Sequence, residues 1–167
     1  ALAGTGKPTL ARVQGPASGI GVGLVAACDI AFVTYDASFA LNEARYGLLP
    51  AVASPYLVAA MGERHCRYYM LTAERFSAMD AYRIGLVHEM VPDEEQLDEA
   101  IGETVETLLK NGANAMGACK TLLRAIGGRP IDATTMEETA QSATVAQSGT
   151  EGRQGMLALA EQRQPEW

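Results

Sequence analysis

A glycine-rich stretch near the start of the chain constrains its fold more than any other feature. The segment QGPASGIGVGLVAACDI, residues 14–30, follows a predicted short strand over residues 9–13 and leads into an apolar run predicted to begin a buried helix at Leu24. Glycine lets backbone amides approach a ligand closely, and the first amides of a helix have no intrahelical partner. The pattern predicts an α/β fold whose turn can hold a carbonyl oxygen that becomes negative during a reaction.

A nucleotide-binding loop is the main alternative for this turn, and the spacing disfavours it. A dinucleotide fingerprint needs three glycines in the pattern G-x-G-x-x-G, but Leu24 stands where the third would fall. Asp36 follows the next predicted strand too soon to bind a ribose, and the stretch holds no lysine for a phosphate loop. A purely structural role, in which the glycines allow the strand and the helix to pack tightly, stays open as a second interpretation.

Hydrophobic periodicity divides the chain into a mixed α/β part, up to about residue 93, and an all-helical remainder. In the mixed part, strands are predicted over residues 30–34, 38–41 and 86–91, and helices over residues 54–61, 63–71 and 77–85. In the helical part, apolar residues recur at helical spacing from Leu97 to Leu108, and further helices are predicted over residues 113–126, 134–147 and 151–163. Ser54 before Pro55 predicts a capped helix start, and Ser77 with Asp80 predicts a capping box.

Composition and charge exclude several function classes. The 167 residues carry a formal net charge of −7, which argues against nucleic acid or an anionic membrane surface as a partner. No apolar run is long enough to cross a bilayer. The three widely spaced cysteines form no metal or redox motif, and they are expected to be buried, reduced thiols of a cytoplasmic protein. His65 and His88 have no acid or cysteine at ligand spacing, so no metal site is expected.

Several linked motifs, in order, carry a resemblance to a known family. The stretches KPTLARVQGPASGIGVGLVAACDIAF, ASFALNEARYGLLP and LTAERFSAMDAYRIGLVHEMVP, followed by the ending SGTEGRQGMLALAEQRQPEW, resemble the enoyl-CoA hydratase/isomerase (crotonase) superfamily. Within it, the chain looks most similar to bacterial methylglutaconyl-CoA-type hydratases. The resemblance implies a crotonase-like ββα spiral core over residues 1–93 and a C-terminal helical oligomerisation segment over residues 94–167. The chain opens without a methionine, so the early strands of the spiral are expected upstream of residue 1.

The resemblance also implies an activity and a set of site residues. Members of the superfamily bind acyl-CoA thioesters and stabilise an enolate oxygen with two backbone amides. One amide matches Ile20, between Gly19 and Gly21, and the other is expected upstream of this chain. Hydratases of the family use two glutamates. The second glutamate matches Glu43, and the first falls on Gly23, which has no side chain. Gly23 is therefore expected to leave a void beside Glu43 that can hold an ordered water.

The individual site residues differ in how far the sequence alone supports them. A glutamate in a polar turn is usually a solvated charge, but Glu43 lies between apolar segments and is expected to be partly buried, as suits a general acid or base. Pro50 and Tyr56 are expected to line the acyl pocket, although Tyr56 fits a core position equally well. The coenzyme A contacts of the family fall on Leu159 and Gln162, which depart from its usual aromatic and lysine, and Arg163 is the substitute cation.

Three functions follow as expectations from this resemblance. The first is addition of water to the α,β double bond of an enoyl-CoA, with Glu43 as acid and base and the Ile20 amide as half of the oxyanion hole. The second is a Δ3,Δ2-enoyl-CoA isomerase, because one glutamate suffices to move a proton. The third is a non-catalytic paralogue that binds acyl-CoA or serves only in assembly. The resemblance further implies a homotrimer or a dimer of trimers, and no cofactor beyond the coenzyme A of the substrate.

Overall fold

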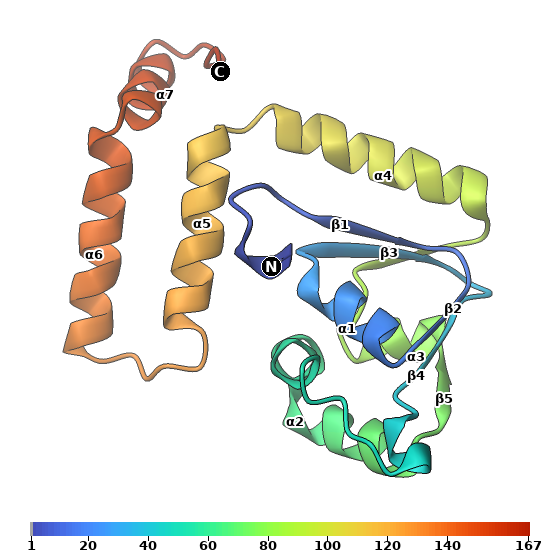
Figure 1. Ribbon diagram of the computed structural model, residues 1–167. Coiled ribbons are helices and arrows are strands. Elements are labelled where there is room, and N and C mark those ends of the chain that lie inside the picture. Colours follow the sequence, from blue (N-terminus) through green and yellow to red (C-terminus); the bar gives the residue numbers. More distant parts are fainter. Residues whose placement is uncertain (1) are drawn as a thin grey trace. The chain divides into compact units, whose positions relative to one another are not determined.

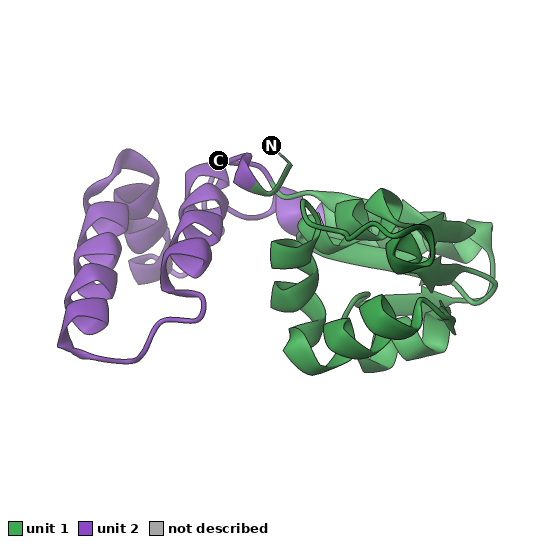
Figure 2. Ribbon diagram, turned by 60° about the horizontal axis from the view of Figure 1, so that its bottom comes forward, with its two compact units in different colours: residues 1–3, 8–105 green, residues 4–7, 106–167 purple. Residues whose placement is uncertain are grey.

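The computed structural model describes residues 2–167, which form two compact units (Figure 2). The first unit comprises residues 8–105 together with the residues before Gly4. The second comprises residues 106–167 together with the short segment Gly4–Lys7. The first unit is mixed α/β and the second is helical, as the periodicity of the sequence predicts.

Two small three-stranded sheets form the frame of the first unit (Figure 1). The first sheet has the order β1-β3-β6, from the strands Leu10–Val13, Ile30–Thr34 and Glu89–Val91, and all its pairings are parallel. The second has the order β2-β4-β5, from the strands Pro16–Ser18, Ser38–Ala40 and Arg75–Ser77. In the second sheet β2 runs parallel to β4, and β5 runs antiparallel to it. Strands β1 and β3 each lead directly into a strand of the second sheet.

Helices fill the connections between these strands and make up the second unit. Those of the first unit are α1 (Ile20–Ala27), α2 (Ser54–Thr72), α3 (Ala78–Arg83) and the short 3-10 helix η2 (Glu43–Tyr46). The 3-10 helix η1 (Leu2–Gly4) precedes β1 and ends at Gly4, the first residue of the short segment assigned to the second unit. The helix α4 (Glu94–Leu109) begins in the first unit and ends in the second. The second unit continues with α5 (Ala113–Ile126), α6 (Ala133–Ser148) and α7 (Thr150–Ala160).

The strand predictions hold where the pattern is strongest and fail for two short edge strands. The strand β3 has the predicted bounds, while β1, β4 and β6 are shorter than predicted. Leu86 and Val87 were expected in the last of these, and they are buried ahead of it. The strands β2 and β5 have three residues each and lie at the two edges of their sheet. Pro16 can begin β2 because an edge strand tolerates the missing N–H of proline.

The start of α1 and the N-cap of α2 differ from the predictions. The helix α1 begins at Ile20 instead of Leu24, because Gly19 adopts a left-handed φ of 54° and turns the chain directly into the helix. The N-cap of α2 is Ala53 and not Ser54, whose hydroxyl donates instead to the carbonyl of Ala51. The predicted break at Gly62 is present as a kink, where φ is 75°, between the two predicted helices.

The core of the first unit lies between α1, α2 and the second sheet. Phe39 of β4 stacks on Phe76 of β5 with ring centroids 5.5 Å apart, and Tyr69 of α2 lies 4.1 Å from Phe76. A second cluster joins Leu97 of α4 to Phe32 of β3. This second cluster places the first turns of α4 on the first sheet, and the compact helical unit begins within α4, at residue 106.

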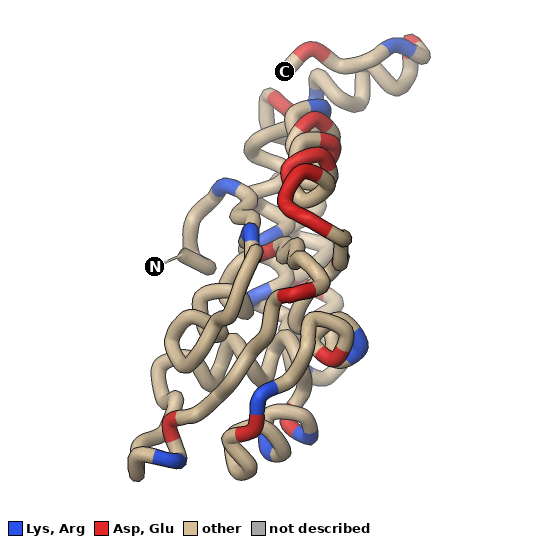
Figure 3. Tube along the Cα trace, turned by 90° about the vertical axis from the view of Figure 1, so that its right-hand side faces the viewer, with Lys and Arg blue, Asp and Glu red and all other residues tan. Residues whose placement is uncertain are grey.

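Ion pairs also join the first turns of α4 to the first sheet. The helix is rich in acidic residues, which Figure 3 shows in red. Arg12 of β1 binds Asp98 at 2.7 Å and Glu94 at 3.1 Å, and its hydrogen bond holds the pKa of the Asp98 carboxyl below its ordinary value. These ion pairs are partly exposed, so they orient α4 more than they stabilise it.

The capping box predicted at the start of α3 is present, and its contribution to the stability of the fold can be tested. The Ser77 hydroxyl accepts from the Asp80 amide at 3.1 Å, and the Asp80 carboxylate accepts from Ser77, which lowers the pKa of Asp80. We expect Ser77→Ala to cost about 1 kcal/mol of unfolding free energy at pH 7. Because the folded pKa is depressed, this stabilisation is present above the ordinary aspartate pKa of about 3.9 and is lost as pH falls through the folded value.

Urea unfolding of the parent and of Ser77→Ala at pH 7 and at pH 3 measures both effects. Ser142→Ala, an exposed serine of α6, serves as the control. Equal stability of parent and variant at pH 7 would contradict the assignment of the capping box.

Candidate active site

Glu43 lies where the second sheet ends and η2 begins. The strand β4 ends at Ala40, and two residues later the chain enters the single turn of η2. Gly47 ends that turn with a left-handed φ of 69°, and the Leu48 amide donates back to the Glu43 carbonyl at 3.1 Å. Backbone hydrogen bonds thus fix the position from which the Glu43 side chain extends.

Gly19 brings the start of α1 against this turn. The pairing of Ser18 with Ala40 in the parallel strands sets the two chain segments side by side. The Gly19 amide then donates to the Ala40 carbonyl at 2.9 Å. A Cβ on Gly19 would lie 3.2 Å from Oε1 of Glu43, and its φ of 54° disfavours any side chain. Glycine at position 19 therefore lets the Glu43 carboxylate approach the N-terminus of α1.

The Ile20 amide lies at the first position of α1. The amides of Val22 and Gly23 both bond to the Gly19 carbonyl, so the Ile20 and Gly21 amides are the helix donors without an intrahelical acceptor. The Ile20 side chain is 66% exposed, and its bulk does not occupy the core. The structure thus brings Glu43, Gly19 and the Ile20 amide together, and a carbonyl oxygen at this helix terminus would lie next to a carboxylate.

The burial of Glu43 fits a role in proton transfer. The residue is half-buried, as the flanking apolar segments predict. Its Oε2 atom is buried and has no hydrogen-bond partner within residues 2–167. An unpartnered buried carboxylate oxygen is costly to a fold, so a bound molecule is the natural partner for it.

The void expected at Gly23 does not exist. Gly23 is buried, and a Cβ placed on it would lie 2.5 Å from the Cβ of Ala53, closer than two carbon atoms approach. Ala53 is the N-cap of α2 and only 5% exposed. Position 23 is a glycine because α2 packs directly on α1 there, so Gly23 serves helix packing and offers no space for a water.

The segment between η2 and α2 presents apolar side chains. Pro50 and Tyr56, predicted to line an acyl pocket, are both half-buried. Around them are more exposed residues that share an apolar character: Tyr46, Leu48, Leu49 and Val52. Ile20 and Leu24 form a second exposed apolar pair one turn apart on α1. Exposed apolar side chains therefore follow Glu43 along the chain and also lie on the first turns of α1.

Gln162 and Arg163 belong to the second unit. The helix α7 ends at Ala160, earlier than predicted, and Gln162 has a positive φ of 55° in the turn that follows. The Arg163 guanidinium binds Glu161 at 2.6 Å and also donates to the Gln164 carbonyl. Arg163, the cation expected to contact coenzyme A, is thus already paired with the carboxylate of Glu161.

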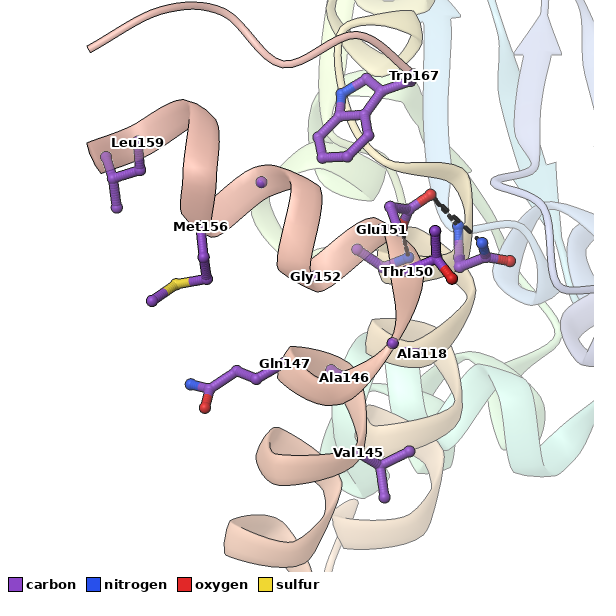
Figure 4. A pocket seen from close by; sticks show the side chains of 14 residues that line it. Ala118, Val145, Ala146, Gln147, Thr150, Glu151, Gly152, Met156, Leu159 and Trp167 are labelled. Atoms are coloured by element: carbon purple, nitrogen blue, oxygen red, sulfur yellow. Dashed lines mark hydrogen bonds between the residues drawn. The ribbon is translucent and has the colours of Figure 1, made fainter. Parts of the chain in front are cut away.

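The second unit contains a hollow of about 600 Å³ between α5, α6 and α7 (Figure 4). Its walls are mainly apolar and include Val145, Met156, Leu159 and Trp167. Its acid, Glu151, accepts from the Asn114 and Ala115 amides at 3.1 and 2.7 Å and so caps α5. The acid of this hollow is thus engaged in capping α5, whereas Glu43 has a carboxylate oxygen without a partner among the described residues, so the candidate site for chemistry is assigned to Glu43.

Other candidate groups are accounted for by structural contacts. His88 accepts from the Ala31 amide at 3.1 Å, and His65 hydrogen-bonds the Met61 carbonyl. Of the cysteines, Cys66 is buried, which raises its pKa, but Cys119 is exposed, so the expectation of uniformly buried thiols was wrong. Across residues 2–167, no cluster of three histidine, cysteine or acidic side chains could hold a metal ion, and no helix is long and apolar enough to cross a membrane.

Comparison with known proteins identifies the family of this chain. The family model described as enoyl-CoA hydratase/isomerase matches residues 1–167. The chain belongs to the enoyl-CoA hydratase/isomerase family. This membership accounts for the strand–turn–helix arrangement at Gly19 and for the two sheets of short strands in the first unit, and it confirms the fold class and the resemblance to the superfamily seen in the sequence.

Relatives in this family include several enzymes that act on coenzyme A thioesters by name. The chain is 35% identical over 118 residues to an enoyl-CoA hydratase of Alternaria alternata, covering 71% of this chain and 40% of that protein. It is 29% identical to a carnitinyl-CoA dehydratase of Escherichia coli O157:H7, covering 96% and 63%. The crystal structure of an enoyl-CoA hydratase from Shewanella pealeana superposes with a TM-score of 0.93 at 38% identity, covering 99% and 62%. The chain thus spans less than two thirds of these relatives.

Asn42 and Ala53 are the two site residues that sequence reasoning missed. Neither carries a group that singles it out in the sequence. Asn42 lies beside Gly19 only because of the strand register, and Ala53 meets Gly23 only because of helix packing.

Proposed function

We propose that the complete protein adds water to the α,β double bond of an enoyl-CoA thioester. The observation that carries this proposal is the Glu43 carboxylate, half-buried, with Oε2 unpartnered among the described residues, held against the N-terminus of α1. At this position Glu43 can act as acid or base on a substrate whose carbonyl oxygen accepts a hydrogen bond from the Ile20 amide.

The proposed chemistry divides between the helix terminus and the carboxylate. The thioester oxygen accepts a hydrogen bond from the Ile20 amide, where the helix dipole and the unpaired N–H favour negative charge. Glu43 removes a proton from a water whose oxygen forms a bond to the β carbon. The electron pair of the double bond moves to the thioester as an enolate, and the protonated Glu43 then delivers the proton to the α carbon. The second oxyanion donor is proposed to come from outside this chain.

The apolar side chains near Glu43 bear on the substrate class. Leu48, Leu49 and Val52 extend from the segment that follows η2, and Ile20 adds a branched side chain at the helix terminus. These groups favour an acyl group that is apolar near the reacting carbons, because such a group gains from leaving water. A methylglutaconyl-type substrate rests on the resemblance of the motifs alone, and it carries a free carboxylate that these apolar side chains do not account for.

A second candidate function, Δ3,Δ2-enoyl-CoA isomerase, is favoured by the contact between Gly23 and Ala53. With Ala53 at 2.5 Å from the place of a Cβ, no second acidic side chain can enter the site from position 23. One carboxylate is sufficient to carry a proton between two carbons of a bound acyl group.

One experiment separates the two functions. The complete protein is given a short 2-enoyl-CoA and, separately, a 3-enoyl-CoA in ¹⁸O-labelled water, and the products are analysed by mass spectrometry. Hydration predicts a labelled 3-hydroxyacyl-CoA. Efficient conversion of the 3-enoyl to the 2-enoyl form, with no label in any product, would instead establish the isomerase and refute the hydratase.

We also propose that the complete protein assembles as a homotrimer or a dimer of trimers through its helical part. Apolar side chains remain exposed on the helices of the second unit: Leu123, Met136, Val145 and Leu159. The proposal requires these side chains to lie together on a surface that a partner covers, since contiguous exposed apolar patches mark interaction sites. Light scattering coupled to gel filtration gives the mass directly, and a monomer at micromolar concentration would refute the assembly.

A further inference from the structure

A single carboxylate must both accept a proton from the attacking water and return it to the substrate, so a second polar group is needed to hold that water. In this chain the second group cannot come from α1. Gly23 carries no side chain, and Ala53 of α2 fills the space that one would need. Any group that holds the water must therefore reach the site from another element.

Asn42 is the polar side chain that the structure places there. A Cβ built on Gly19 would lie 3.9 Å from Oδ1 of Asn42 and 3.2 Å from Oε1 of Glu43. The amide and the carboxylate therefore reach the N-terminus of α1 together. They come from neighbouring residues at the end of β4, where backbone hydrogen bonds fix both.

The side-chain amide of Asn42 does not cap η2, although Asn42 is its N-cap residue. Asn42 occupies the N-cap of η2, and asparagine at an N-cap normally accepts a hydrogen bond from the helix amides. Here its side chain makes no such bond. The backbone of Asn42 has φ −94° and ψ 8°, in the sparsely populated bridge region where many active-site residues are found. Because this half-buried side-chain amide makes no capping hydrogen bond, it is available to hydrogen-bond a bound molecule.

We propose that Asn42 holds the attacking water in place of a second carboxylate. Its Oδ1 accepts one hydrogen of the water while Glu43 accepts the other, so that a lone pair of the water oxygen is directed at the β carbon. Glu43 takes the proton as the carbon–oxygen bond forms, and the proton then passes to the α carbon, as in the proposed hydration. Asn42 gains and loses no proton. This inference rests on the proposed hydratase function.

The test compares two reactions of the complete protein that share Glu43 and differ in the need for water. Hydration of a short enoyl-CoA needs the held water. Exchange of the α proton of a saturated acyl-CoA in D₂O needs only Glu43 and the oxyanion donors. We expect Asn42→Ala to lower kcat for hydration by about 10²-fold, since a misplaced reactant costs that much, with KM changed less than about twofold and the exchange rate preserved.

Two further variants complete the design. Asn42→Ser keeps a hydroxyl that can accept from the water, and it should recover part of the lost hydration. Asn111→Ala, an exposed asparagine outside the first unit, is the matched control and should hydrate like the parent. If Asn42→Ala does not fold, as judged by circular dichroism, then Asn42→Ser carries the test, with its hydration expected to fall while its exchange is preserved.

The outcomes separate this inference from the function on which it rests. Hydration by Asn42→Ala within about twofold of the parent, in a parent that depends on Glu43, would overturn the role of Asn42 alone. An equal fall of hydration and exchange would assign Asn42 a structural role and overturn the inference as well. A parent that exchanges protons but never gains solvent oxygen would overturn both the hydratase and the water-holding residue.

Discussion

Replacing Glu43 by Gln will lower turnover of a short enoyl-CoA by about 10²- to 10⁴-fold, the usual contribution of a general acid or base. Glutamine has nearly the same shape as glutamate, so it can occupy the place beside Gly19 where Oε1 now lies 3.2 Å from the missing Cβ. The amide cannot accept and return a proton. Binding of the thioester, which we propose depends on the Ile20 amide and on apolar contacts, should remain nearly intact.

The measurement is steady-state kinetics of the complete protein together with calorimetric titration of a saturated acyl-CoA. Glu89→Gln, an exposed glutamate of β6, is the matched control and should retain the activity of the parent. A Glu43→Gln variant that turns over within about twofold of the parent would remove Glu43 from the mechanism. Loss of binding together with turnover would show that Glu43 acts on the substrate in its ground state.

The sequence predicted the fold well where the signal is local. The helix α5 has the predicted bounds because Gly112 and Gly127 flank its periodic apolar residues, and the strand β3 has them because its residues are β-branched and aromatic. It missed β2 and β5, because strands of three residues at a sheet edge are stabilised by pairing with β4 and not by their own pattern. Without β2, the adjacency of Gly19 and Ala40 could not be derived from the residues themselves.

The candidate site was found from the resemblance more than from the physics of the sequence. Glu43 is 24 residues from Gly19, and only the parallel register of β2 and β4 brings them together. The family motif already contained that information, so Glu43 and Ile20 were predicted as a pair. Asn42 and Ala53 have no motif that marks them, so their part in the site emerged only from the packing.

Gly23 shows how a departure from a family pattern can be misread from sequence alone. An absent side chain suggests an empty space, but a space is empty only if its neighbours leave it so. Here Ala53, the N-cap of α2, lies against the α1 backbone at Gly23, and both positions are buried. The small residues at 23 and 53 are a matched pair, since either one with a larger side chain would force the two helices apart.

Substituting Gly23 by Leu should therefore destabilise the protein instead of filling a cavity. Its Cβ alone would lie 2.5 Å from that of Ala53, so α2 must shift, and overpacking of this kind typically costs about 1–3 kcal/mol. Because the shifted helix follows the segment that bears Pro50, hydration and α-proton exchange should decline together, not hydration selectively. Chemical denaturation and both assays measure these effects.

A compensating change makes the prediction specific to this contact. Ala53→Gly removes the Cβ that a side chain at position 23 would meet, and glycine is acceptable at an N-cap. Gly23→Ala should lose stability, and the double variant Gly23→Ala/Ala53→Gly should regain part of it, because the two sites are coupled and do not add. Gly102→Ala, at an open position on α4, is the control and should not destabilise. Stability of Gly23→Leu equal to that of the parent, or selective loss of hydration in it, would restore the empty space beside Glu43 and contradict the packing described.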